Sequence, residues 1–119
     1  AIGGAVTRLC SVLPVTATVD GRVLCVHSGL YPKIDYERPC AYENIPPIVR
    51  KIVFGEPTAR VKTFRAKPNV KNGNIFGVNA VKKMCRKQHL EFIVRSRTPI
   101  DTGFAVIFDN KLVNIWSCN

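Results

Sequence analysis

The sequence predicts an α/β (α+β) fold in which helices pack against a mixed sheet. Three features lead to this prediction: a hairpin signal in the first third, an amphipathic helical pattern in the second half, and a strand followed by another hairpin near the end. The order hairpin, loop, helix, strand, hairpin suits such a sheet better than an all-β sandwich. With 119 residues, 46% of them hydrophobic, the chain can bury one core, so we expect one domain or part of one over residues 1–119.

The first hairpin is indicated by "PVTATVDGRVLCVH", residues 14–27. β-branched and small residues alternate before Asp20 and Gly21, a dipeptide that supplies the positive φ angles of a type I′ turn. The run Val23 to Cys25 returns as the partner strand, which we expect to be buried. His27 then lies at the C-terminal end of this strand, at a sheet edge where ligands often bind.

Two loop-like segments follow. Residues 28–48 are rich in Pro, Gly and Tyr, and we expect a loop in which Asn44 caps a turn through residues 45–52. Residues 56–74 are polar, basic and bounded by turn residues, which indicates a surface loop with at most one short strand over "RVKTF", residues 60–64.

A helix is predicted over residues 76–87, because Val78, Val81 and Cys85 recur at helical spacing with basic residues on the other side. His89 follows it, where a C-terminal cap or a packing role is expected.

The remaining elements are a strand over residues 90–95 and a hairpin in which residues 109–111 join "GFAVIF" to "LVNIWS". Arg95, Ser96 and Arg97 stand at the end of the first of these strands. They are therefore candidate site residues by the same argument as His27.

Charge is the strongest compositional feature, with 18 Lys and Arg against 8 Asp and Glu, a formal net charge of +10. Between Pro57 and Leu90 there is no acid, and the basic residues are Arg60, Lys62, Arg65, Lys67, Lys71, Lys82, Lys83, Arg86 and Lys87. An anionic partner is one interpretation, whether a phosphorylated protein, an acidic protein face or nucleic acid. The other is a solvated basic surface without a specific partner.

The five cysteines, at positions 10, 25, 40, 85 and 118, are odd in number and never spaced as CxxC. They predict free, mostly buried thiols in a reducing compartment rather than a disulfide framework or a zinc site. No apolar run approaches the roughly 20 residues of a membrane span, and the N-terminus lacks the charged region of a signal peptide. We therefore expect no membrane partner and a cytoplasmic or nuclear location.

Three blocks carry a family resemblance: "LPVTATVDGRVLCVHSGL", "FGVNAVKKMCRKQHLEFIVRSRT" and "GFAVIFDNKLVNIWS". In order and approximate spacing they resemble the phosphoprotein phosphatase family of Ser/Thr protein phosphatases, over the C-terminal half of its domain. The resemblance implies the C-terminal portion of a calcineurin-like metallophosphoesterase β-sandwich flanked by helices. It also implies a two-metal hydrolase in which metals of the Mn, Fe or Zn type activate a water for attack on phosphorus.

Site residues follow from the same resemblance. His27, in "HSGL", matches the family's metal-ligating His in "HGGL", and Ser28 replaces the first Gly. Arg97 stands where the family has a second His ligand, and a protonated guanidinium has no lone pair for a metal. Lys71 is the only cation beside the position of the family's phosphate-contacting arginine, so the anion-binding candidates are Arg95, Arg97 and Lys71. His27 and Arg97 should converge on one edge of the structure.

Three hypotheses remain open. The family's upstream blocks "GDxHG", "GDxVDRG" and "GNHE", which supply most metal ligands, do not occur in these residues. The first hypothesis is a non-catalytic phosphatase-like domain or half-domain that needs no cofactor and acts through a protein partner, with a missing N-terminal half as one candidate. The second is a fragment of an active two-metal phosphatase, and the third is a basic module that binds nucleic acid or an acidic partner.

Overall fold

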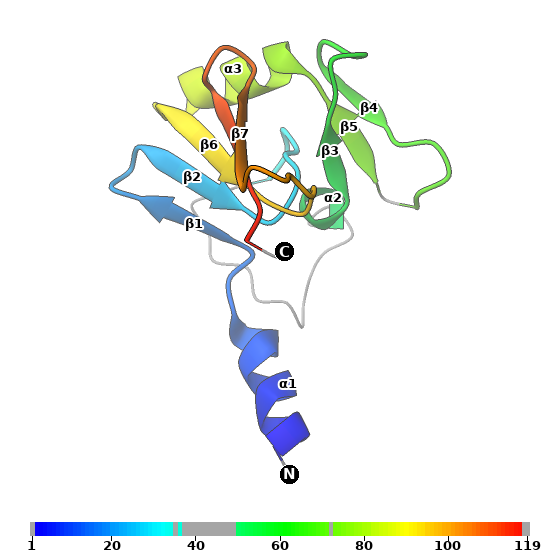
Figure 1. Ribbon diagram of the computed structural model, residues 1–119, viewed down its shortest axis with the longest axis vertical. Helices are drawn as coiled ribbons and strands as arrows, with labels where there is room; N and C mark the ends of the chain where they lie inside the picture. Colours follow the sequence, from blue (N-terminus) through cyan, green and yellow to red (C-terminus); the bar gives the residue numbers. More distant parts are fainter. Residues whose placement is uncertain (1, 35, 37–49, 72, 118–119) are drawn as a thin grey trace.

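The computed structural model describes residues 2–34, 36, 50–71 and 73–117, which form two sheets and three helices (Figure 1). The larger sheet has the strand order β1-β2-β6-β8-β7, and the smaller has the order β3-β5-β4. Strands of the larger sheet are β1 Thr16–Val19, β2 Val23–Val26, β6 Phe92–Arg95, β7 Phe104–Ile107 and β8 Leu112–Ile115. Strands of the smaller sheet are β3 Gly55–Pro57, β4 Phe64–Ala66 and β5 Asn74–Phe76. The helices are α1 Ile2–Val12, α2 Arg50–Val53 and α3 Val78–Lys87.

The larger sheet is mixed, as the sequence predicts. Its three central strands β2, β6 and β8 run parallel, and each outer strand is the antiparallel arm of a hairpin. In the first turn Asp20 and Gly21 have φ angles of 52° and 63°, which confirms the predicted turn chemistry. The α/β fold class and both predicted hairpins are therefore confirmed.

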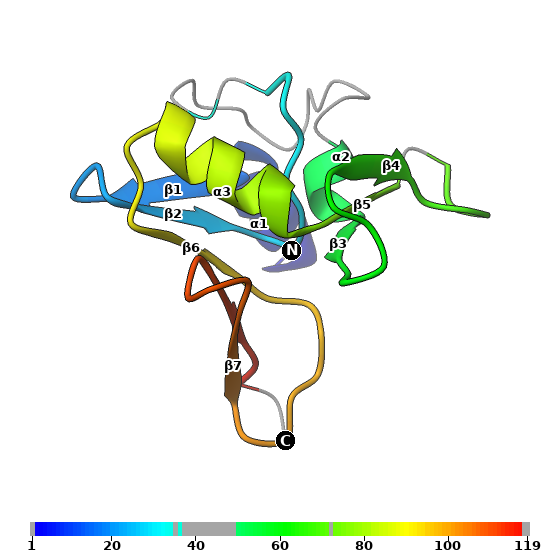
Figure 2. The ribbon, with the colours of Figure 1, turned by 90° about the horizontal axis from the view of Figure 1, so that it is seen from above.

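The core lies between this sheet and α3, which crosses one of its faces (Figure 2). Strands contribute Leu24, Ile93 and Leu112, each at most 1% exposed, because alternate residues of a strand face the same side. From α3 come Val81 and Cys85, as the helical spacing predicts. The predicted helix is confirmed, although it begins at Val78 rather than two residues earlier.

The smaller sheet corrects the prediction of a surface loop over residues 56–74. β3 pairs in parallel with β5, β5 pairs antiparallel with β4, and Phe76 at the end of β5 is fully buried. The strand predicted over residues 60–64 overlaps β4 only at Phe64. Each of the three strands has only three residues, too few to show a period-2 pattern among polar and turn-forming neighbours.

The N-terminal helix α1 was not predicted, and it extends away from the sheets (Figure 1). The cysteine prediction is correct in part: Cys85 is buried, Cys25 is half-buried and Cys10 on α1 is exposed, so the thiols are not mostly buried, and these three are free. Cys40, Cys118 and the predicted cap at Asn44 lie outside the described residues. Among the helices described, none is long and apolar enough to cross a membrane.

Candidate functional site

His27 and Arg97 follow the ends of two neighbouring parallel strands. The β2 and β6 pairing places Cys25 opposite Val94, and the Ser96 N–H donates to the His27 carbonyl oxygen at 3.1 Å. The predicted convergence of the two positions on one edge of the structure is therefore confirmed. Val23 and Cys25 are half-buried rather than fully buried, because they face the side of the sheet opposite the core.

The Arg97 side chain lies beside a small group of side chains from β3 and the residues next to it. Its Nη1 is 3.7 Å from Glu56 Oε1, and its guanidinium carbon is 5.5 Å from the centre of the Phe54 ring. Lys67 Nζ approaches the same Glu56 oxygen at 2.5 Å. The Arg97 side chain is 37% exposed, so its charge both reaches solvent and is matched by a carboxylate. Glu56 and Lys67 were missed in the sequence because only the tertiary fold brings them to Arg97.

Arg95, another candidate site residue, is buried within the protein and is not part of its surface. The residue is 1% exposed, and it donates through Nε to the Ser28 carbonyl oxygen and through Nη2 to Ser28 Oγ. Nη1 donates at 2.5 Å to both Thr98 Oγ1 and Asn114 Oδ1. Four of the five N–H donors of the guanidinium are thus engaged by the protein itself. These contacts give Arg95 a structural role at the end of β6, and its binding of an anion stays a prediction.

Ser28, the residue that replaces the first Gly of the family motif, is fully buried and completes this network. Its Oγ accepts from Arg95 Nη2 at 3.0 Å and donates to the Gly55 carbonyl oxygen. The added hydroxyl therefore connects the end of β2 to both Arg95 and β3. The replacement was visible in the sequence, but its partners were not.

Partial burial and two neighbouring cations favour the neutral form of the His27 imidazole. Partial burial is the largest cause that lowers the pKa of His27, and the charges of Arg97 and Arg95 lower it further. Burial also lowers the pKa of Arg95 to about 10, with Glu56 raising it and Arg97 lowering it. Arg95 consequently stays charged at neutral pH. His27 is a neutral imidazole whose neighbours are the positively charged Arg95 and Arg97.

A hollow of about 470 Å³ opens beside this group. Both arginines, Glu56, Thr98 and Asn114 contribute to its lining, together with Pro57, Pro99, Ile100, Ala105 and Ile107. Lys71, the third anion-binding candidate, is not among the lining residues. It is exposed in the connection between β4 and β5, which extends away from the larger sheet (Figure 1). The structure thus brings His27 and Arg97 together but not Lys71.

The described residues do not fit a two-metal centre. Nowhere in the described ranges do three His, Cys, Asp or Glu side chains come together so that they could hold a metal ion. His27 offers one imidazole, and the neighbouring ligand position holds the Arg97 guanidinium, which repels a dication. A metal would need several further donors that these residues do not supply.

Comparison with known proteins confirms the family resemblance. The chain is 27% identical over 118 residues to a PP2A-like Ser/Thr protein phosphatase, PPG1, of Candida albicans. It is 29% identical over 117 residues to the catalytic subunit of Ser/Thr protein phosphatase 6 of Caenorhabditis elegans. These alignments cover 94% and 92% of this chain but only 28% and 35% of the relatives, so the chain spans about a third of their length.

The fold has a solved counterpart in a Saccharomyces cerevisiae Ser/Thr phosphatase with similarity to human PP5. The TM-score is 0.63 at 18% identity, over 88% of this chain and 34% of that one. No protein-family model matches the chain. Its homologues are nevertheless Ser/Thr protein phosphatases, and the chain is a divergent, phosphatase-like relative of the phosphoprotein phosphatase family.

Proposed function

We propose that this chain is part of a phosphatase-like domain that does not catalyse phosphate ester hydrolysis and acts by binding a protein partner. The observation that carries the proposal is Arg97, which stands beside His27 where the resemblance implies a second imidazole ligand. A permanently protonated guanidinium removes one donor and adds one positive charge at the same point. Both changes weaken a site for divalent cations.

The surroundings of Arg97 support a stable replacement of this kind. Glu56 supplies a negative charge at 3.7 Å, and the Phe54 ring lies beneath the guanidinium. We infer that Arg97 supplies the fixed positive charge that a metal ion would otherwise give to this edge of the sheet.

Partner binding is supported by what the chain leaves exposed. Large apolar side chains of α1 and of the edge strands face solvent, and the formal net charge is +10. Partners of two kinds fit these surfaces: a polypeptide that completes the phosphatase-like domain, and an acidic or phosphorylated protein. The free cysteines at positions 10, 25 and 85 support a reducing location, cytoplasmic or nuclear.

The alternative function is an active two-metal phosphatase of which this chain is a fragment. One observation favours it: the lowered pKa of His27 keeps a neutral imidazole ready to ligate a metal. The remaining ligands would then come from residues outside this chain. Because the chain spans about a third of the length of its relatives, activity of a longer protein is a separate question from activity of these residues.

The test compares the full chain with Arg97→His and, as a matched charge control at a distant lysine, Lys71→Ala. Mn²⁺ affinity is measured by calorimetry and hydrolysis of p-nitrophenyl phosphate by absorbance. We expect neither tight Mn²⁺ binding nor turnover in the unmodified chain. Arg97→His should bind Mn²⁺ measurably more strongly but still weakly, because one donor replaces one repelling charge while the further donors stay absent from the described residues, and Lys71→Ala should not change. Turnover in the unmodified chain that His27→Ala abolishes would overturn the proposal. Unchanged metal binding in a folded Arg97→His variant would show that Arg97 is not the decisive substitution.

A further inference from the structure

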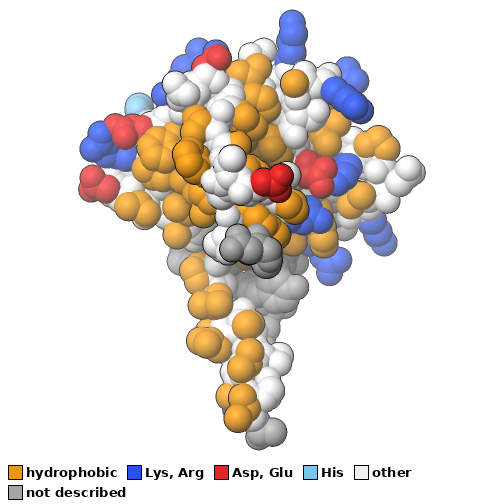
Figure 3. Space-filling model, viewed as in Figure 1, with side chains coloured by type: hydrophobic (Ala, Val, Ile, Leu, Met, Phe, Trp, Pro, Cys, Tyr) orange, Lys and Arg blue, Asp and Glu red, His pale blue; other side chains and the backbone are white. Residues whose placement is uncertain are grey.

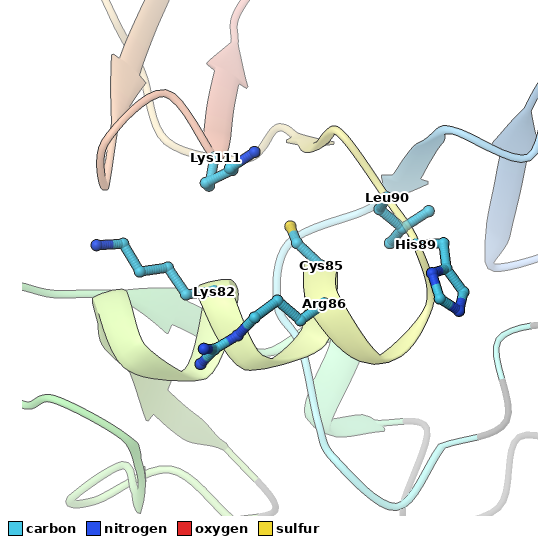
Figure 4. A pocket seen from close by; sticks show the side chains of 6 residues that line it. All are labelled: Lys82, Cys85, Arg86, His89, Leu90 and Lys111. Atoms are coloured by element: carbon cyan, nitrogen blue, oxygen red, sulfur yellow. The ribbon is translucent and has the colours of Figure 1, made fainter.

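We propose that a basic hollow beside α3 binds an acidic polypeptide segment, through a phosphate or carboxylate group that neighbours an apolar side chain. The hollow has a volume of about 600 Å³ and shares no lining residue with the one at Arg97. Its lining residues are Lys82, Cys85, Arg86, His89, Leu90 and Lys111 (Figure 4). The inference rests on the proposed partner binding and assigns it a surface and a chemistry.

The cations of this basic hollow come from two elements that face each other. Lys82 and Arg86 lie one turn apart on α3, and Lys111, in the turn just before β8, lies across from them (Figure 4). The Lys111 ammonium donates to the Glu91 carbonyl oxygen at 2.9 Å, which holds it at the hollow. A solvated helix face would spread its cations into water. Here a second part of the chain lines the same open hollow, so three cations border one space, which favours an anion.

The floor of the basic hollow is apolar. Cys85 and Leu90 are 3% and 8% exposed, and the sulfur of Cys85 points into the gap between α3 and Lys111 (Figure 4). Burial raises the pKa of Cys85, so its thiol stays protonated and acts as a small apolar group. Among the described residues that line the hollow there is no Phe, Tyr or Trp, the side chains on which single-stranded nucleic acid binders commonly stack successive bases. The composition therefore favours an acidic peptide over nucleic acid.

The edge of the basic hollow already holds one carboxylate of the protein itself. Asp109, in the turn between β7 and β8, forms an ion pair with Lys82. Phe108, Asp109 and Asn110 all have positive φ angles, an uncommon backbone conformation for non-glycine residues. A bound acid would compete with Asp109 for Lys82 while Arg86, which makes no ion pair within the described ranges, remains available. Neutralising Asp109 should then strengthen binding.

The experiment measures the affinity of the metal-free full chain for a labelled peptide by fluorescence anisotropy. The peptide contains one phosphoserine, flanking aspartates and one leucine. Two further peptides carry Asp or Ser in place of phosphoserine. A single-stranded oligonucleotide of equal charge is measured in the same way, to compare nucleic acid with the peptides. We expect Arg86→Ala to weaken binding of the phosphoserine and Asp peptides by about tenfold, the effect of one charge-assisted hydrogen bond. Asp109→Asn should tighten it by about threefold, in line with one weak surface ion pair. Lys83→Ala, an exposed position on the same helix outside the hollow, should change it by less than about twofold.

Several results would overturn the inference. Equal losses in Arg86→Ala and Lys83→Ala would mean diffuse charge attraction, and no gain in Asp109→Asn would mean that Lys82 is not used. Tighter binding of the oligonucleotide would favour nucleic acid. The peptide-binding experiment contains no metal. A result in the Mn²⁺ and turnover test of Arg97→His that overturns the proposed function therefore leaves the peptide affinities unaffected. Circular dichroism confirms that each variant keeps its fold.

Discussion

Arg95 and Arg97 are two positions apart, yet one is buried and the other reaches solvent. A continued strand would point both side chains to the same face, because the period of a strand is two. The strand ends at Arg95, however, and Arg97 has a φ angle of 79°, which redirects the chain. The sequence places the two arginines side by side, and this backbone change is the reason that their side chains have different surroundings.

The environment of His27 gives a prediction about its titration. Burial and two guanidinium groups disfavour the imidazolium, so the pKa of His27 should lie below its ordinary value of 6.5 and rise in Arg97→Met. The shift should be seen by NMR of the ring carbon-bound protons, with Lys71→Met as a control that leaves the midpoint unchanged.

The sign of the associated stability change follows from linkage. When the pKa of a histidine is lowered in the folded state, the unfolded state binds the proton more readily. The resulting stability is fully present above the unfolded pKa, and it is lost as the pH falls through the folded pKa. The free energy of unfolding should therefore decrease as pH falls below about 6.5, and His27→Gln should reduce this dependence. A His27 midpoint at or above 6.5, or no rise in Arg97→Met, would contradict the described placement of the guanidinium groups.

The connection between the two sheets depends on a close contact of two glycines. A Cβ added at Gly29 would lie 2.4 Å from Gly55 Cα, and the Gly29 N–H donates to the Ile52 carbonyl oxygen at 2.6 Å. Because both neighbours are backbone, neither can move aside by changing rotamer. This contact explains why the second glycine of "HSGL" is retained while the first position accepts serine.

Gly29→Ala should therefore lower the free energy of unfolding by about 3 kcal/mol or prevent folding, as overpacking at a fixed backbone does. Urea denaturation followed by circular dichroism measures the change. Gly3→Ala is the matched control, since an added Cβ on α1 meets nothing within 4 Å and alanine favours a helix. If Gly29→Ala were as stable as the unmodified chain, the two sheets could not approach each other as described.

The molecule as a whole leaves much apolar surface uncovered. On α1, the exposed fractions of Ile2, Val6, Leu9 and Val12 range from 52% to 86%. Hydrophobic side chains also gather over the visible face of the larger sheet (Figure 3). On β7, Phe104 is 60% exposed. Contiguous apolar surface of this kind marks an interaction site or a tendency to aggregate.

We expect the chain alone to self-associate in a concentration-dependent manner at micromolar concentration, because association would cover these side chains. Sedimentation velocity measures this. Val6→Lys combined with Leu9→Lys should lower the association constant by at least about tenfold, while Thr7→Lys on the polar side of α1 should have little effect. A monomeric unmodified chain, or equal effects of all three substitutions, would show that α1 is not an association surface.

The strands of the larger sheet, α3 and the positions of His27 and Arg97 at one edge follow from local patterns and from the family blocks. Alternation, helical spacing and the Asp20-Gly21 turn all act between residues close in sequence, which is why they can be read there. The second sheet, the burial of Arg95 by Ser28 and Asn114, and the meeting of Glu56 with Arg97 could not be predicted. Each joins residues far apart in the chain through three-residue strands or single hydrogen bonds. Such contacts leave no periodic trace in the sequence, because only the folded backbone brings their members within reach.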